Sequence, residues 1–158
     1  MAIAERLERL FEDAAVNYGV LEHPPAYTAQ EEAAATHVPG QNWVKTVVVL
    51  LDGEPVLLAL PAHREVDLDA LIEATDASSA ELMKEEEFEN LYPDSEVGAM
   101  PPFGVLYGQK TFLEESLRDD DYVAFHAGDH QTAVRISLHD YLELAEPIPL
   151  AFARSSDD

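Results

Sequence analysis

The sequence predicts a single α/β domain, with a mixed β-sheet or partly closed barrel and peripheral helices. Val44 to Leu51 is a β-branched, almost entirely apolar run, and a second apolar run, Val56 to Leu60, follows the turn signal Asp52-Gly53. This pattern is typical of a hairpin in the middle of a sheet. Segments with helical spacing lie on both sides, and 158 residues are enough for one core.

The remaining elements are predicted from apolar spacing, capping residues and turn signals. In chain order we expect a helix within residues 1–19, a short strand at Val20-Leu21, a helix over Glu31–Thr36 with a Thr28–Glu31 capping box, the hairpin, a helix capped by Asp67, a helix over Lys84–Leu91, strands over Val105–Tyr107, Tyr122–His126 and Thr132–Ile136, and a helix from Ser137 to about Leu144. We expect one domain over residues 1–158, with its core at about 20–146 and a frayed tail over 154–158.

The composition is strongly acidic, with 32 Asp+Glu against 9 Lys+Arg and a net charge of −23. This argues against a surface that coats nucleic acids, and we expect no DNA partner. The chain has no cysteine, which excludes disulfides, thiolate nucleophiles and cysteine-based zinc sites. The acidic N-terminus and the absence of a long apolar run predict a soluble, cytoplasmic protein with no membrane partner. A salt-rich cytoplasm would also suit this charge, because salt screens it.

Several catalytic motifs are absent. The sequence contains no GxSxG, GxxxxGK[ST], GxGxxG or HExxH. We therefore do not expect an ordinary serine hydrolase, a nucleoside triphosphatase, an enzyme that binds a dinucleotide cofactor or a zinc protease.

Lys45 is the first candidate functional residue, because it stands near the start of a strand that is otherwise apolar. One interpretation is a lysine at the mouth of the strand that reaches solvent. The other is a cation held at a pocket rim, where it binds a phosphate, a carboxylate or a developing oxyanion.

The second candidate is the loop Gly98-Ala99-Met100-Pro101-Pro102-Phe103-Gly104. It is either a plain connector or a stiff loop that offers backbone amides. The second interpretation predicts donors for an oxyanion or a nucleotide from the amides of Ala99, Met100, Phe103 and Gly104.

The third candidate is the histidine segment His126-Ala127-Gly128-Asp129-His130. Two histidines and an aspartate are metal-ligand types, but a turn at Gly128 need not bring them together, so we favour a pocket-lining turn or a plain hairpin end. His23, near Tyr27, is likewise either a packed histidine or a pocket residue.

Four segments in this order resemble the YbaK/prolyl-tRNA synthetase-associated domain family. They are HPPAYTAQEEAA, VKTVVVLL, GAMPPFG and FHAGDHQTAVRIS. The resemblance runs from about Leu21 to Leu144, and Gly98, Pro102 and Gly104 meet the family's GxxxPxG pattern.

The resemblance implies a YbaK-like fold and an aminoacyl-tRNA deacylase that hydrolyses the ester of mischarged tRNA. It implies no metal, no cofactor and no covalent enzyme nucleophile, since water or a group on the substrate attacks, assisted by the terminal ribose hydroxyl. The family lysine is Lys45, and we expect its ammonium to face residues 98–104 across a cavity. The implied substrate-binding residues are His23, Tyr27, Thr46, Gly98, Ala99, Met100, Pro102, Gly104, Gly128, Asp129 and His130.

The expected function is trans-editing, with the 3′ end of a mischarged aminoacyl-tRNA as substrate and an aminoacyl-tRNA synthetase as a further candidate partner. The acidic charge departs from this expectation. Either a basic patch of Lys45, Arg64 and Lys110 suffices, or high salt screens the repulsion, or the partner delivers the tRNA. Two alternatives stay open: a catalytically silent nucleotide- or synthetase-binding module of the same fold, and a hydrolase of small acyl esters.

Overall fold

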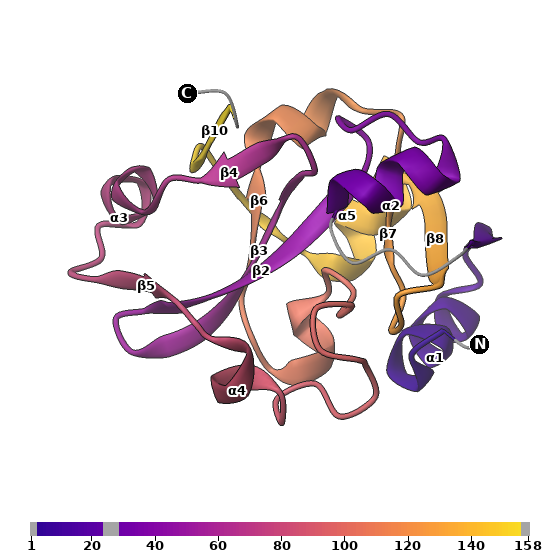
Figure 1. Ribbon diagram of the computed structural model, residues 1–158, viewed down its shortest axis with the longest axis horizontal. Helices are drawn as coiled ribbons and strands as arrows, with labels where there is room; N and C mark the ends of the chain where they lie inside the picture. The colour runs from indigo at the N-terminus through magenta and orange to yellow at the C-terminus, as the bar shows by residue number, and fades with distance from the viewer. Residues whose placement is uncertain (1–2, 24–28, 156–158) are drawn as a thin grey trace.

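The computed structural model describes residues 3–23 and 29–155 and shows a mixed α/β domain (Figure 1). The helices are α1 (Glu5–Ala14), α2 (Ala29–Thr36), α3 (Leu68–Thr75), α4 (Glu85–Phe88) and α5 (Leu138–Ala145), with 3₁₀ helices η1 (Gly104–Tyr107) and η2 (Glu115–Asp119). The strands are β1 (Tyr18–Glu22), β2 (Val44–Leu51), β3 (Glu54–Pro61), β4 (Arg64–Val66), β5 (Ala80–Leu82), β6 (Thr111–Glu114), β7 (Tyr122–His126), β8 (Thr132–Ser137), β9 (Ile148–Leu150) and β10 (Ala153–Ser155).

The strands form separate sheets rather than a closed barrel. The largest has the order β5-β2-β3-β6-β9, and the others are β1-β8-β7 and β10-β4. β6 is parallel to both β3 and β9, which makes the large sheet mixed. An isolated parallel bridge between Trp43 and Ala124 joins the start of β2 to β7. In Figure 1, β2 and β3 cross the middle of the molecule, with β7, β8, α1, α2 and α5 on one side and α3 and β5 on the other.

The predicted central hairpin is confirmed. β2 and β3 pair from Val44 with Pro61 to Leu51 with Glu54. Asp52 and Gly53 between them both have positive φ, 51° and 83°, as a two-residue type I′ hairpin turn requires. The Asp52 carboxylate also accepts hydrogen bonds from the amides of Ser78 and Ser79, which ties the turn to the segment before β5.

The pleat of the hairpin separates two apolar clusters. Val44 and Ala59 point into the main core, which contains Phe103 and Phe125 and is covered by α1 and α5. Val49, Leu58 and other residues of the opposite parity pack on α3. Successive strand residues face opposite sides of a sheet, so the two clusters lie on the two faces of the hairpin.

Helix caps follow the predicted signals in two places. Asp67 accepts from the amide of Ala70 at the start of α3, and Ser137 accepts from the amide of Asp140 at the start of α5. Elsewhere the boundaries differ from the prediction. The N-terminal helix ends at Ala14 and Tyr18-Gly19 already belongs to β1, while the predicted helix over Lys84–Leu91 is the single turn of α4. Thr28, the predicted cap of α2, lies outside the described residues.

Two further predictions are wrong. The predicted strand over Val105–Tyr107 is the 3₁₀ helix η1, because Gln109 and Leu106 donate amide hydrogen bonds back to the Gly104 and Phe103 carbonyls. The predicted frayed tail begins too early. Arg154 and Ser155 pair with β4 as part of β10, while residues 156–158 lie outside the described part. No helix in the described ranges is long and apolar enough to cross a membrane.

Gly104 is a position where only glycine fits. A Cβ at this residue would lie 2.5 Å from both the Gln109 carbonyl oxygen and the Thr111 hydroxyl. We expect Gly104→Ala to lower the free energy of unfolding by about 2 kcal/mol or more, because overpacking displaces backbone atoms here. Gly19→Ala is the matched control, since a Cβ there meets nothing within 4 Å. Urea denaturation of both variants checks this, and equal midpoints would contradict the packing argument.

His126 makes stability depend on pH. Burial and the nearby His130 lower its pKa from 6.5 to about 4 in the folded protein. Between these values the unfolded chain binds a proton that the folded chain does not, so stability is lost as the pH falls from about 6.5 to 4. The contribution is at most about 3 kcal/mol. We expect unfolding free energies of wild type to fall more steeply over this range than those of His126→Phe. Parallel curves for the two proteins would show that His126 does not titrate in this way.

Candidate functional site

Lys45 is partly buried near the start of β2, opposite Leu60 of β3. Burial lowers the pKa of Lys45 below its ordinary value, and the Glu65 carboxylate nearby opposes that shift. No residue of the described ranges forms a hydrogen bond or ion pair with its ammonium. The ammonium is thus partly desolvated, and the nearby Glu65 carboxylate offsets only part of the cost of burying its charge.

The side on which Lys45 leaves the strand differs from the expectation. Val44 packs with Phe103, and Val48 packs with Met100, so these two valines point toward the 98–104 loop. Lys45 lies between them and points to the other face of β2 by the alternation of the pleat. The expectation that its ammonium faces this loop directly is therefore wrong. Thr46, which is also partly buried, has the parity of Val44 and Val48 and shares the loop side.

The 98–104 loop is part of the core rather than an exposed cradle. Residues 99–104 are buried, and Phe103 is a main-core residue. The Tyr141 hydroxyl donates to the Pro102 carbonyl at 2.8 Å. Proline pairs and glycines usually mark surface turns, which is why the sequence alone did not indicate this burial.

Most of the predicted amide donors of the loop are already engaged. The amide of Ala99 donates to the Glu96 carbonyl at 3.0 Å, that of Phe103 to the Pro101 carbonyl at 2.8 Å, and that of Gly104 to the Thr111 hydroxyl at 2.8 Å. These three are not free to bind an oxyanion, which corrects the prediction. Within the described part of the chain, the amides of Gly98 and Met100 donate no hydrogen bond and are the remaining candidates.

The loop is attached to the turn between β7 and β8. The amide of Gly128 donates to the Ala99 carbonyl at 3.0 Å, and the amide of Glu96 donates to the Gly128 carbonyl at 2.7 Å. The His130 ring Nε2 lies 3.0 Å from the Val97 carbonyl oxygen, and a Cβ on Gly98 would lie 3.5 Å from the same ring. The structure thus brings together four of the predicted site residues: Gly98, Ala99, Gly128 and His130.

Asp129 supports the shape of this turn. Its carboxylate accepts a hydrogen bond from the Gln131 amide at 2.9 Å. Gly128 has φ 126°, and a Cβ there would lie 2.9 Å from the Ala4 amide nitrogen. The Gly-Asp pair therefore fits a tight turn on which the start of α1 packs.

A histidine cluster adjoins the turn. The His126 ring lies 5.3 Å from that of His130 and 5.6 Å from that of Trp43, each in an edge-to-face arrangement. Burial, then His130, and more weakly His23, lower the pKa of His126 to about 4, so His126 is neutral at pH 7. Trp43 is completely buried and was missed from the sequence. Strand alternation puts Ala124 and His126 on the same side of β7, but only the Trp43–Ala124 bridge in the structure brings Trp43 to that side.

His23 lies at the edge of this cluster. Its amide donates to the Gln131 carbonyl at 3.0 Å. His23 also lines a cavity of ≈ 180 Å³ together with Glu22, Gln131 and Thr132. Tyr27, predicted to stand beside it, lies outside the described residues.

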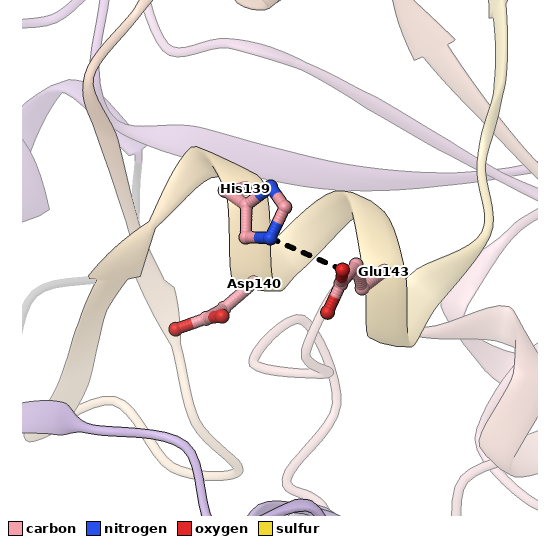
Figure 2. A group of neighbouring side chains, drawn as sticks. All are labelled: His139, Asp140 and Glu143. Atoms are coloured by element: carbon pink, nitrogen blue, oxygen red, sulfur yellow. Dashed lines mark ion pairs between the residues drawn. The ribbon is translucent and has the colours of Figure 1, made fainter.

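The histidines of the cluster do not form a preassembled metal site. In the described ranges, the one group whose ligand atoms lie within 4.8 Å of one another is His139, Asp140 and Glu143 (Figure 2). All three come from α5, and His139 pairs with Glu143 at 3.1 Å with 76% and 64% of these side chains exposed. An exposed pair one helical turn apart is an ordinary surface feature, and we assign no ion to it.

The cations that were expected to form a basic patch around Lys45 are dispersed. Arg64 lines a polar cavity with Arg118, whereas Lys110 lines a different cavity beside Leu51 and Ile148. The acidic residue whose charge acts on the pKa of Lys45 is Glu65, which sequence reasoning missed. It follows Lys45 by twenty positions and approaches only through the β3–β4 connection.

Curated relatives point to one family. A 97-residue stretch is 32% identical to the proline–tRNA ligase of Nitratidesulfovibrio vulgaris, covering 61% of this chain and 17% of that protein. A 68-residue stretch is 38% identical to the proline–tRNA ligase of Streptomyces griseus subsp. griseus, covering 43% of this chain and 12% of that protein. The chain thus matches only a small part of these relatives' length.

Solved structures share the fold. A hypothetical protein matches with a TM-score of 0.84 at 19% identity, covering 95% of this chain and 100% of that one. A crystal structure described as a proposed trans-editing enzyme for prolyl tRNA synthetase matches with a TM-score of 0.81 at 20% identity, covering 96% and 97%. The family model of the aminoacyl-tRNA editing domain matches residues 23–144, which contain Lys45, the 98–104 loop and the histidine turn. The chain belongs to the aminoacyl-tRNA editing domain family.

Proposed function

We propose that this protein is an aminoacyl-tRNA deacylase that hydrolyses the ester of mischarged tRNA in trans. The observation that carries the proposal is the Lys45 ammonium, which is partly desolvated and has no hydrogen bond or ion pair with a described residue. Such a cation is available to an anionic or polarised oxygen of a ligand. An aminoacyl-tRNA offers two of these, the ester carbonyl oxygen and the phosphate before the terminal adenosine.

The proposed chemistry requires little from the protein, because an aminoacyl ester is already reactive. Water adds to the ester carbonyl, the bond to the ribose oxygen breaks, and that oxygen takes up a proton as the amino acid leaves. The protein's part is to orient the ester and to stabilise the negative charge that develops on the carbonyl oxygen. The unengaged amides of Gly98 and Met100 are candidate donors for this oxygen, whereas Lys45, which leaves β2 on the other side, would hold the phosphate before the terminal adenosine.

Thr46 and the histidine turn complete the proposed site. Thr46 lies on the loop side of β2, whereas Lys45 lies on the other side, so the substrate would contact β2 at its edge rather than lie on one face. Gly98 and His130 are in contact at the loop, and His23 adjoins the cavity of ≈ 180 Å³.

The charge of −23 favours a partner in the proposed reaction. The surface repels an RNA backbone at long range. A synthetase that already holds the tRNA would remove this obstacle, and the relatives matched above are proline–tRNA ligases.

Lys45→Ala tests the proposal. On a panel of mischarged tRNAs we expect wild type to hydrolyse at least one, and Lys45→Ala to lower kcat/KM for it by about a hundredfold, because the ester is no longer held in the reactive position. Lys45→Arg should retain part of the activity because the charge remains. Lys110→Ala, which removes one exposed lysine from a different cavity, is the matched control and should leave kcat/KM unchanged.

The outcomes separate the proposal from its alternatives. Equal rates for wild type and Lys45→Ala, with both proteins folded by circular dichroism, would overturn the role of Lys45. No turnover of any charged tRNA, together with saturable binding of an adenosine-ended ligand, would favour a silent binding module. Turnover of a small tRNA-free acyl ester alone, insensitive to salt, would favour the small-ester hydrolase.

A further inference from the structure

A second hollow lies at the far end of the three-stranded sheet from the histidine turn. Its volume is ≈ 560 Å³, and it is found where β1 and β7 begin and β8 ends. The residues that matter for its chemistry are Asn17, Gly19, Asp121, Tyr122 and Arg135. None of them belongs to the site described above.

Arg135 and Tyr122 form a stacked pair in this hollow. The guanidinium carbon of Arg135 lies 3.7 Å from the centroid of the Tyr122 ring. Arg135 is exposed and forms no ion pair with any residue in the described ranges. The guanidinium therefore lies over the tyrosine ring, and the exposed side chain is accessible to a ligand.

The surface beside Arg135 is open because its neighbour on β1 is glycine. Gly19 pairs with Arg135 in the sheet register, and a Cβ on Gly19 would meet no atom within 4 Å. A planar group can thus approach the guanidinium without meeting a side chain from β1. Planar groups that stack on arginine and tyrosine on exposed sheet faces are the bases of single-stranded RNA.

We propose that this hollow is a stacking platform for an unpaired base near the 3′ end of an RNA, with the base lying on the Arg135 guanidinium. The proposal rests on the proposed function for the identity of the RNA. Stacking suits this chain because it does not depend on attraction to phosphates, which a net charge of −23 opposes.

Asp121 gives the platform a base preference. It is exposed at the rim of the hollow, and a carboxylate accepts hydrogen bonds from the exocyclic amino groups of cytosine and adenine. Uracil has no exocyclic amino group, and its single ring N3–H lies between two carbonyl oxygens, which the carboxylate repels. The platform should therefore prefer cytosine or adenine over uracil.

The platform and the histidine cluster share one face of β7. Tyr122 and His126 are four residues apart, so both point to the same side, about 13 Å from each other along the strand. Ala33 of α2 packs with Ala124 and Ala133 between them. A strand bound at both places must pass around α2, so the base on Arg135 is a nucleotide upstream of the terminal adenosine.

Binding of short oligonucleotides tests the platform without requiring catalysis. By calorimetry we expect the trinucleotide CCA to bind wild type about tenfold more tightly than UUU does, and more tightly than free CMP. Arg135→Ala should weaken CCA binding about tenfold, in the range for loss of one stacked base. Arg135→Lys should weaken it as much, because an ammonium has no plane on which to stack. Arg118→Ala, which removes the same charge from another exposed position, is the matched control and should change binding less than twofold.

Each outcome supports or overturns the platform. Stacking would be overturned if Arg135→Lys bound CCA as tightly as wild type does. Equal losses of CCA affinity in Arg135→Ala and Arg118→Ala would also overturn it. Equal affinity for CCA and UUU would overturn the role of Asp121, and CMP binding as tightly as CCA would overturn an RNA ligand. Raising the salt concentration should leave the Kd of CCA unchanged or lower it. A strong loss of CCA affinity at high salt would instead indicate phosphate contacts. If deacylation is found, Arg135→Ala should raise KM and leave kcat unchanged. If none is found, the oligonucleotide results still decide the platform.

Discussion

The site depends on the hydrogen bonds that attach the 98–104 loop to the β7–β8 turn. Glu96 and Gly128 are joined by one backbone bond, and Gly128 and Ala99 by another. On the other side of the turn, the Ala4 amide donates to the Ala127 carbonyl at 2.6 Å. These contacts join three segments that are far apart in the sequence, so the position of Gly98 beside His130 is set by the packing of the domain rather than by the loop itself. Gly128 permits them because a side chain there would collide with the start of α1.

The pleat of β2 imposes a second constraint. Consecutive residues of a strand leave it on opposite sides, so Lys45 and Thr46 cannot both face the loop. Thr46 and the neighbouring valines point toward the loop, and Lys45 points to the opposite face of β2. There the Glu65 carboxylate opposes the effect of burial on the pKa of Lys45. A substrate that meets both residues must therefore lie across the edge of β2 near Trp43, where β2 meets β7 through a single bridge.

Local signals in the sequence predicted the parts of the fold that local interactions determine. The β2–β3 hairpin, its Asp52-Gly53 turn and the Asp67 and Ser137 caps were all identified. The four-residue strand β6 and the three-residue strands β4, β5, β9 and β10 were missed, because each is stabilised by pairing with a distant strand rather than by its own pattern. For the candidate site, the sequence indicated Lys45 and the glycines, and their roles stay predictions. It could not show that residues 99–104 are buried, because Gly104 is required by the approach of Gln109 and Thr111 and not by its own turn.

The acidic surface constrains the proposed binding of an RNA. Among the described cations, Arg9 pairs with Glu5 and Arg154 with Glu65, while Arg6 donates to the Leu106 carbonyl and lies over Tyr107. Few cations are left to offset 32 acidic residues, so long-range attraction cannot select the substrate. Selection must come from contacts made at short range, where desolvated groups interact strongly and the surrounding field matters less. Lys45, which is partly desolvated, and Arg135, which is stacked on a tyrosine, are two cations in such settings. An RNA 3′ end would therefore be recognised by its shape and its unpaired bases, and a partner that brings it close would contribute more to the rate of encounter than to the fit.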